Sequence, residues 1–234
     1  MTLNPQTQAE LKRAVGRKAA ALVRDGMLVG LGTGSTATFF IEHLIERVRE
    51  GLRITAVSSS LRSADQARQG GIKVLDMNEV TSIDLTVDGA DEIDPQDHMI
   101  KGGGGALLRE KIVASSSHQV IIIVDESKLV PVLGTFGLPI EILPFGYQAT
   151  IHKLAKLGYE GSLRMANQQP FITDNGHYIF DIHSPKTFSN PSQDHNRMIA
   201  LAGVIETGFF FDLPIQVLVG YYDGSVAFRR SQHG

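Results

Sequence analysis

Four consecutive glycines, Gly102-Gly103-Gly104-Gly105, stand between Lys101 and a predicted helix over about residues 106–114. Ordering four glycines costs much conformational entropy, so a backbone that must lie close to a ligand is a good explanation for the run. Glu110 falls within the helix that follows. Its spacing alone is more typical of an exposed glutamate that pairs with a neighbouring cation, because such pairs are common on helices. The glycine run therefore predicts a ligand-binding loop, while the role of Glu110 stays open.

A second group is the acidic segment Asp88-Gly89-Ala90-Asp91-Glu92-Ile93-Asp94, which directly follows a predicted buried strand and holds four carboxylates in seven residues. Asp88 and Asp91 can face one site from a turn opened by Gly89, where they would bind sugar hydroxyls or transfer a proton. Two alternatives remain. One is an acidic turn in solvent, and the other is a magnesium site, since clustered carboxylates also suit that ion.

A third segment, Gly32-Thr33-Gly34-Ser35-Thr36, combines glycines with hydroxyls where a short strand gives way to a predicted helix. Glycines let backbone N–H groups approach an anion, and the N-terminus of the helix adds a partial positive charge. Thr33, Ser35 and Thr36 can donate further hydrogen bonds. The segment matches neither the dinucleotide-binding pattern nor the P-loop. The alternative is a tight turn in which Ser35 or Thr36 caps the helix.

Two lysines could bind an anion. Lys128 ends the polar segment Asp125-Glu126-Ser127-Lys128, which follows an apolar strand predicted over 120–124. It can bind a phosphate or oppose a carboxylate, although a lysine in a polar loop is commoner. Lys12, in the predicted first helix, allows the same interpretations. The eight histidines form no metal-binding pattern such as H-E-x-x-H, so no metal is expected.

The polar segments share one position, because each follows a predicted strand. These strands lack polar alternation and are separated by helices, which is typical of a parallel sheet covered on both faces. Ligands on such sheets bind beyond the carboxyl ends of the strands, so the polar loops should meet at one edge. The predicted strands are 27–31, 53–57, 72–75, 83–87 and 120–124, and the predicted helices contain residues 11–22, 40–48, 61–69 and 106–114.

The second half of the chain has a mixed pattern that indicates a smaller α+β lobe. Asn175-Gly176 is a typical turn between two hairpin strands. We predict a main domain of residues 1–128 and 207–234, with the smaller lobe over 129–206 and a tail that rejoins the first sheet. The predicted elements are strands at 138–143, 204–211, 215–219 and 226–228, a hairpin at 171–181, and helices at 150–157 and 193–201.

The composition narrows the class of protein. A net charge of -3 without a long basic run argues against nucleic acid as a partner. The absence of cysteine excludes disulfides, thiolate metal sites and cysteine nucleophiles, and it fits a cytoplasmic protein. The longest aliphatic run, Val120 to Val124, is far too short to cross a bilayer, and the N-terminal segment lacks the apolar core of a signal peptide. We expect a cytoplasmic protein that binds neither nucleic acid nor membrane.

Taken together, these segments resemble ribose-5-phosphate isomerases of the A type. The motifs occur in the right order along nearly the whole chain, so individually weak signals form a strong pattern. One departure is Gly105, where the family often has alanine, and it should loosen the turn slightly. The motifs are GLGTGSTA from Gly30, VSSS from Val57, VDGADEID from Val87, KGGGGALLREKI from Lys101, DESK from Asp125, LPIEILP from Leu138, TDNG from Thr173 and GVIETGFF from Gly203.

The resemblance implies a Rossmann-like main domain with a smaller ferredoxin-like lobe, assembled as a homodimer or tetramer. It also implies interconversion of ribose 5-phosphate and ribulose 5-phosphate without metal or organic cofactor. Glu110 then matches the catalytic base, while Asp88, Asp91 and Lys101 match residues at the reacting end of the sugar. The implied substrate-binding residues are Thr33, Gly34, Ser35, Thr36, Asp88, Gly89, Ala90, Asp91, Lys101, Gly102, Gly103, Gly104 and Lys128, with Lys12 near the phosphate.

Other functions stay open. A related enzyme could be an amino-sugar-phosphate deaminase, or a CoA-transferase in which the glutamate is a nucleophile instead of a base. A metal-dependent isomerase would shift a hydride between the two carbons. A sugar-phosphate sensor without catalysis is the alternative from a different class, but the chain has no helix-turn-helix or basic DNA-binding segment.

Overall fold

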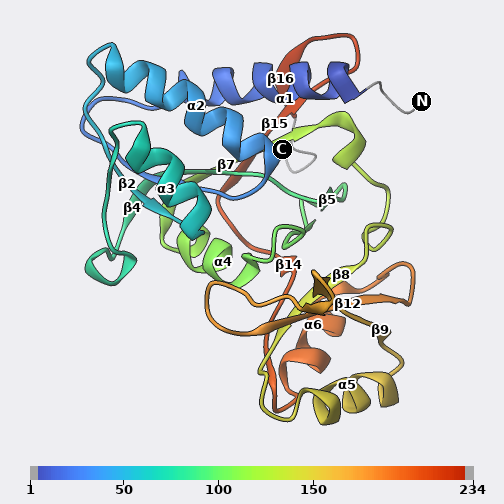
Figure 1. The fold of residues 1–234 in the computed structure, drawn as a ribbon. Coiled ribbons are helices and arrows are strands. Elements are labelled where there is room, and N and C mark those ends of the chain that lie inside the picture. The colour runs from blue at the N-terminus through green and yellow to red at the C-terminus, as the bar shows by residue number, and fades with distance from the viewer. Residues whose placement is uncertain (1–4, 230–234) are drawn as a thin grey trace. The chain divides into compact units, whose positions relative to one another are not determined.

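The aliphatic run Val120 to Val124 lies in an interior strand of a seven-stranded sheet (Figure 1). In the computed structural model, which describes residues 5–229, the run belongs to β7 (Ser117–Asp125). This strand pairs in parallel with β4 (Ile83–Asp88) on one side and β15 (Ile215–Gly220) on the other. Every residue of β7 from Val120 onward is buried, which requires apolar side chains on both faces. The predicted parallel sheet is confirmed.

The other strands of this sheet are β1 (Leu28–Leu31), β2 (Thr55–Ser58), β3 (Lys73–Val74) and β16 (Val226–Phe228). Hydrogen bonds join the seven strands in the order β16-β15-β7-β4-β1-β2-β3. All neighbours are parallel except β16, which runs antiparallel to β15 at one edge. The tail of the chain therefore rejoins the first sheet, as predicted.

Four helices cover the sheet: α1 (Pro5–Ala20), α2 (Ser35–Arg49), α3 (Leu61–Gln69) and α4 (Leu107–Ser115). The first three share one core, in which α1 packs beside α2 and the α2 residues Phe40 and Leu44 are fully buried (Figure 1). Ala56 of β2 belongs to this core, whereas its neighbour Val57 packs with Val113 of α4. Because successive strand residues point to opposite faces, α4 covers the other face.

The start of α2 differs from the prediction. Its N-cap residue is Gly34, at φ 104°, and no side-chain hydrogen bond caps the helix. Ser35 and Thr36 lie inside the first turn, and Lys12 Nζ donates to Ser35 Oγ at 3.0 Å. The prediction that Ser35 or Thr36 caps the helix is therefore wrong. Glycine adopts positive φ without steric cost, so the chain enters the helix directly after it.

The smaller antiparallel sheet has the order β13-β8-β12-β9 and carries two helices. Its elements are β8 (Leu138–Ile142), α5 (Tyr147–Lys156), β9 (Glu160–Leu163), β12 (Tyr178–Ser184), α6 (Pro191–Ile199) and β13 (Val204–Thr207). Leu154 of α5 and Met198 of α6 share a buried core with Ile140 and Phe180 of the sheet. This succession of strands and helices is ferredoxin-like, so the predicted smaller lobe is confirmed. Between β9 and β12, β10 (Met165–Ala166) pairs with β11 (Gln169–Pro170).

A small three-stranded sheet was not predicted. It consists of β5 (Glu92–Ile93), β6 (Met99–Ile100) and β14 (Phe209–Phe210), in the order β14-β6-β5. The turn between β5 and β6 is held by Asp94, whose Oδ1 accepts from the Gln96 and His98 N–H groups at 2.9 Å. Strands of two residues leave no alternating pattern in the sequence, so the prediction treated this segment as a loop. Short 3-10 helices occupy Met77–Glu79 and Glu126–Lys128.

The strand predicted over 204–211 is two strands in different sheets, because β13 pairs with β8 and β14 pairs with β6. Gly208 lies at the break. Its N–H donates to Pro139 O at 2.7 Å, and its carbonyl accepts from Lys101 N at 2.9 Å. A Cβ on Gly208 would lie 2.5 Å from Lys101 O, so only glycine fits between the segments that contain Lys101 and Pro139. Because the residues on both sides of Gly208 are mostly apolar, the sequence pattern predicts one continuous strand.

The described residues divide into two compact units. The first contains 5–90, 109–128 and 213–229, and the second contains 91–108 and 129–212. The three-stranded sheet accounts for the inclusion of 91–108 in the second unit, because its strands join this segment to β14. The boundaries predicted from the sequence, after residues 128 and 206, stay a prediction.

Tyr159 gives the second unit a testable pH dependence. Its side chain is 3% exposed, and its hydroxyl donates to Asp194 Oδ1 at 2.6 Å. Burial, followed by this hydrogen bond, raises the pKa of Tyr159 to about 12 from 10.0. The raised pKa means that Tyr159 stabilises the fold below pH 10, and that this contribution is lost as the pH rises toward 12.

We therefore expect Tyr159→Phe to be less stable than the unmodified protein at pH 8. The difference in urea-unfolding free energy should shrink between pH 10 and pH 11. Tyr222→Phe, at a tyrosine with 38% exposure, is the matched control. A stability difference for Tyr159→Phe that stays constant from pH 8 to pH 11 would contradict the prediction.

Candidate active site

Asp88 closes β4, and its carboxylate is anchored by two backbone N–H groups. Its Oδ1 accepts from the backbone N–H groups of Thr33, at 3.0 Å, and Gly89, at 2.7 Å. The side chain is 2% exposed. Gly32 lies so close that a Cβ there would be 2.1 Å from Asp88 Oδ1. Gly32 therefore serves a steric purpose, because the absence of a side chain there lets two loops share one carboxylate.

The loops that follow β1, β2 and β4 meet at one edge of the sheet, as predicted. Thr33 Oγ1 lies 2.8 Å from Ser59 Oγ, and Ser63 Oγ donates to Gly32 O at 2.8 Å. The bond from Thr33 N to Asp88 links the same loop to β4. Parallel pairing of the three strands places all their carboxyl ends at this edge.

Lys12 and Ser35 add a cation and a hydroxyl beside the first turn of α2. The ammonium group of Lys12 donates to Ser35 Oγ at 3.0 Å. Ser35 and Thr36 lie at the N-terminus of the helix, where unpaired backbone N–H groups favour an anion. Lys128, in the 3-10 helix after β7, is half-buried. Each of these residues follows or faces the carboxyl end of a strand in the first unit, the place expected for a bound anion.

Glu110 lies in the first turn of α4 and is 3% exposed. The alternative of an exposed glutamate is therefore wrong. Burial of a carboxylate is costly unless its environment stabilises the charge, and the N-terminal end of a helix helps to do so. A carboxylate held in this way is suited to accept and return a proton.

Lys101 belongs to the second unit, where it directly follows β6 and precedes the glycine run. It is 3% exposed, and its Nζ lies 5.4 Å from the centre of the Phe210 ring. A cation over an aromatic face is stabilised by the ring quadrupole. The backbone N–H of Lys101 donates a hydrogen bond to Gly208 O at 2.9 Å. The lysine that the sequence placed in a loop is thus a buried, anchored cation.

Asp91 holds the glycine run directly. Its Oδ2 accepts from Gly103 N at 2.7 Å, and its own N–H donates to Ile100 O at 2.8 Å. Gly105 N donates to Gly102 O at 2.9 Å, which closes a turn within the run. The amides of Gly103 and Gly105 are therefore engaged inside the protein. Gly103 and Gly104 are nevertheless exposed, as a ligand-binding loop requires.

The other two carboxylates of the acidic segment have structural partners. Glu92, 3% exposed, accepts from Gly134 N at 2.6 Å and Phe136 N at 2.7 Å. Asp94 holds the turn between β5 and β6. The alternative of an acidic turn in solvent is therefore wrong, since Asp88, Glu92 and Asp94 are all buried. Asp88 and Asp91 contact the loops predicted to bind the ligand.

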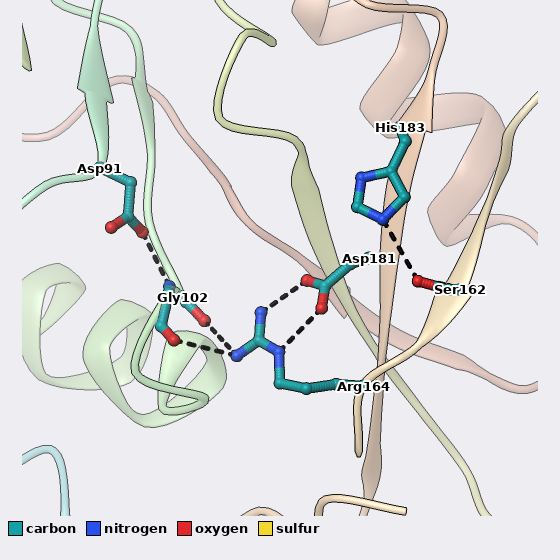
Figure 2. A network of polar contacts seen from close by, with 7 residues as sticks. Asp91, Gly102, Ser162, Arg164, Asp181 and His183 are labelled. Carbon is teal, nitrogen blue, oxygen red and sulfur yellow. Dashed lines mark hydrogen bonds and ion pairs between the residues drawn. The ribbon is translucent and has the colours of Figure 1, made fainter. Parts of the chain in front are cut away.

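Two functional candidates escaped the sequence analysis, because no motif contains them. Arg164 donates to the carbonyls of Gly102 and Gly103, and it forms a bidentate ion pair with Asp181 (Figure 2). Both residues come from the region that the sequence assigned to the smaller lobe. An arginine and an aspartate in an α+β lobe are ordinary surface residues by pattern alone, so only the three-dimensional structure identifies them.

Among residues 5–229, no cluster of three or more histidine, aspartate or glutamate side chains has the arrangement of a metal site. Within the same range, no helix combines the length and apolar character that crossing a bilayer would need.

Residues 55–224 match the family described as ribose 5-phosphate isomerase A (phosphoriboisomerase A). The chain is 50% identical to ribose-5-phosphate isomerase A of Protochlamydia amoebophila over 222 residues, which are 94% of this chain and 96% of that protein. It is also 50% identical to the Bacillus cereus protein of the same name over 214 residues, covering 92% and 97% of the two chains.

Solved structures agree with these relatives. Ribose 5-phosphate isomerase from Plasmodium falciparum superimposes with a TM-score of 0.91 at 37% identity, covering 96% of this chain and 100% of that one. A D-ribose-5-phosphate isomerase in complex with phospho-erythronic acid gives a TM-score of 0.89 at 36% identity, with coverage of 97% and 100%. The similarity thus extends over both units.

Proposed function

Because this chain belongs to the ribose 5-phosphate isomerase A family and interconverts ribose 5-phosphate and ribulose 5-phosphate, we propose that Glu110 is the base that moves the proton. The observation that carries this assignment is the burial of its carboxylate, 3% exposed, in the first turn of the helix after the glycine run.

In the proposed mechanism, the sugar first opens to its acyclic form, assisted by Asp88 or Asp91 as acid or base. Glu110 then removes the proton from C2 of the aldose, which gives a cis-enediolate. The same carboxylic acid returns the proton at C1, while the proton of the C2 hydroxyl is transferred to the C1 oxygen, and the ketose forms. Lys101 stabilises the negative charge that develops on the oxygen. The amides of Gly103 and Gly105 have protein partners, so Lys101 is the main donor in this proposal.

The phosphate end of the substrate supplies binding energy that positions the reacting carbons. Thr33 to Thr36 and Lys128 are proposed to hold the phosphate, with Lys12 beside them. The bond from Lys12 to Ser35 and the helix N-terminus support this assignment. The remaining proposed contacts with the sugar are Gly89, Ala90, Gly102, Gly103 and Gly104.

The related isomerase solved with phospho-erythronic acid suggests a ligand for this chain. A four-carbon sugar acid phosphate carries a planar carboxylate where the reaction passes through a planar enediolate. A ligand of that shape would compete with ribose 5-phosphate for the proposed residues.

Assembly into a homodimer or tetramer in the cytoplasm is also part of the proposal. It is supported by the family resemblance and by a chain without cysteine.

The test of the mechanism is turnover of ribose 5-phosphate in deuterated water that contains a chelator. We expect ketose to form at an undiminished rate and to carry solvent deuterium at C1, because Glu110 exchanges its proton with water between the two steps. A metal-dependent hydride shift would stop in chelator and would leave C1 unlabelled. A covalent glutamyl adduct would instead favour the CoA-transferase chemistry.

A further inference from the structure

The guanidinium group of Arg164 joins a strand of the smaller sheet to the glycine run (Figure 2). On one side, Nε and Nη2 donate to the two carboxylate oxygens of Asp181 in β12, at 2.8 and 2.5 Å. On the other side, Nη1 donates to Gly102 O at 3.0 Å and to Gly103 O at 3.1 Å. All these residues belong to the second unit.

The glycine run needs such an anchor. Gly102 and Gly105 have φ of 105° and 78°, a region in which residues with side chains are strained. Glycines also leave the chain without side chains of its own to pack, so its conformation depends on hydrogen bonds from elsewhere. Asp91 binds Gly103 N, and Arg164 binds two carbonyls of the same loop (Figure 2). The loop is therefore held by hydrogen bonds both to its N–H group and to its carbonyl groups.

Arg164 is itself fixed in place. Its N–H donates to Ile179 O, and its carbonyl accepts from Phe171 N, both at 2.8 Å. Its guanidinium carbon lies 5.9 Å from the centre of the Phe171 ring. That ring also packs on the loop, since a Cβ at Gly105 would lie 2.4 Å from it. Next to this pair, Ser162 Oγ and His183 Nε2 make another cross-strand contact, at 3.2 Å (Figure 2).

The charge of Arg164 is matched by Asp181, and both side chains are mostly buried, with 18% and 22% exposure. A bidentate arginine–carboxylate pair of this geometry is rigid and has no net charge. It suits the support of a loop better than the capture of a substrate phosphate. Lysine could not replace arginine here, because one ammonium group cannot satisfy the carboxylate and both carbonyls at once.

We propose that Arg164 is a positioning residue for the isomerase reaction, and that it acts with Asp181 by holding the Lys101–Gly105 loop in its catalytic conformation. The inference rests on the proposed function, in which Lys101 stabilises the enediolate. Displacement of a catalytic group by about 1 Å can lower the rate by roughly 10²-fold. The phosphate contacts proposed for Thr33 to Thr36 do not involve Arg164, so KM should change much less than kcat even though the loop also supplies proposed sugar contacts.

The experiment compares Arg164→Lys, Arg164→Met and Asp181→Asn with Lys101→Met in the full-length enzyme. We expect kcat to fall roughly 10–100-fold in the three anchor variants, while KM for ribose 5-phosphate changes less than about threefold. The double variant Arg164→Lys with Asp181→Asn should be no slower than its slower parent, because both changes break the same anchor. Each kcat is calculated for the concentration of folded enzyme, and the folded fraction of each variant is measured by circular dichroism and thermal melting.

Arg53 provides the matched control, since its Nε and Nη2 both donate to Asp25 Oδ2, at 3.1 and 2.5 Å, on the exposed surface of the first unit. Arg53→Met should keep both kcat and KM. A large loss of kcat in Lys101→Met with unchanged kcat in all anchor variants would overturn the inference and leave the proposed function standing. Unchanged kcat in Lys101→Met would refute the proposed role of the lysine, and with it the inference.

Discussion

Glu110→Gln is expected to convert ribose 5-phosphate with a kcat roughly 10²–10⁴-fold lower than that of the unmodified enzyme. Glutamine has nearly the same volume as glutamate, so the first turn of α4 keeps its packing. Its amide cannot accept the proton from C2, and only the slower background transfer to water remains. Initial rates of ribulose 5-phosphate formation, measured at saturating substrate, give the change in kcat directly.

Glu42→Gln is the control for this substitution. Glu42 lies on α2, and its exposed side chain pairs with Arg13 at 3.4 Å. An exposed ion pair contributes little, so this variant should match the unmodified enzyme in both rate and melting temperature. Glu110→Asp adds a graded test, because it keeps the carboxylate but withdraws it by one methylene. Full turnover of a folded Glu110→Gln enzyme would refute the assignment of the base.

Gly32→Ala should produce the second large loss. A Cβ at Gly32 would lie 2.1 Å from Asp88 Oδ1 and 2.5 Å from Asp88 Cα, so the backbone must move as well as the side chain. Overpacking of this kind destabilises a fold by roughly 1–3 kcal/mol. Because the move breaks the bond from Thr33 N to Asp88, we also expect kcat/KM to fall by roughly 10²-fold.

Gly89→Ala separates the steric effect from the general loss of a glycine. The nearest atoms to a Cβ at Gly89 are 3.9 Å away, an ordinary contact distance. The free energy of unfolding of this variant, measured in urea, should lie within about 0.5 kcal/mol of that of the unmodified protein. Equal stability of Gly32→Ala and Gly89→Ala would show that the Asp88 carboxylate does not depend on the absence of a side chain at Gly32.

The sequence was sufficient to predict the sheet and its functional edge, because both depend on local signals. Apolar strands such as 120–124 without alternation indicated burial on both faces, and polar loops after them indicated the edge. The bond between Thr33 and Asp88, 55 residues apart, is a direct consequence of parallel pairing between β1 and β4. The fold class followed for the same reason.

Features that depend on long-range contacts could not be predicted. Gly208 breaks a continuous apolar run because Pro139 and Lys101 approach it from both sides. The anchor from Arg164 to Gly102 joins residues 62 apart in the sequence, and no local pattern marks either end of it.

The position of β15 has a consequence for how the protein is made. β7 lies between β4 and β15, and β15 is synthesised only after the whole smaller lobe. A ribosome-bound chain that has reached residue 212 therefore exposes one unpaired edge of β7, whose residues from Val120 onward are buried in the finished protein. Such an edge is a template for a strand of another molecule. Premature termination between residue 212 and the end of β15 should thus yield aggregating fragments, in which the second unit is complete but β7 lacks its neighbour β15.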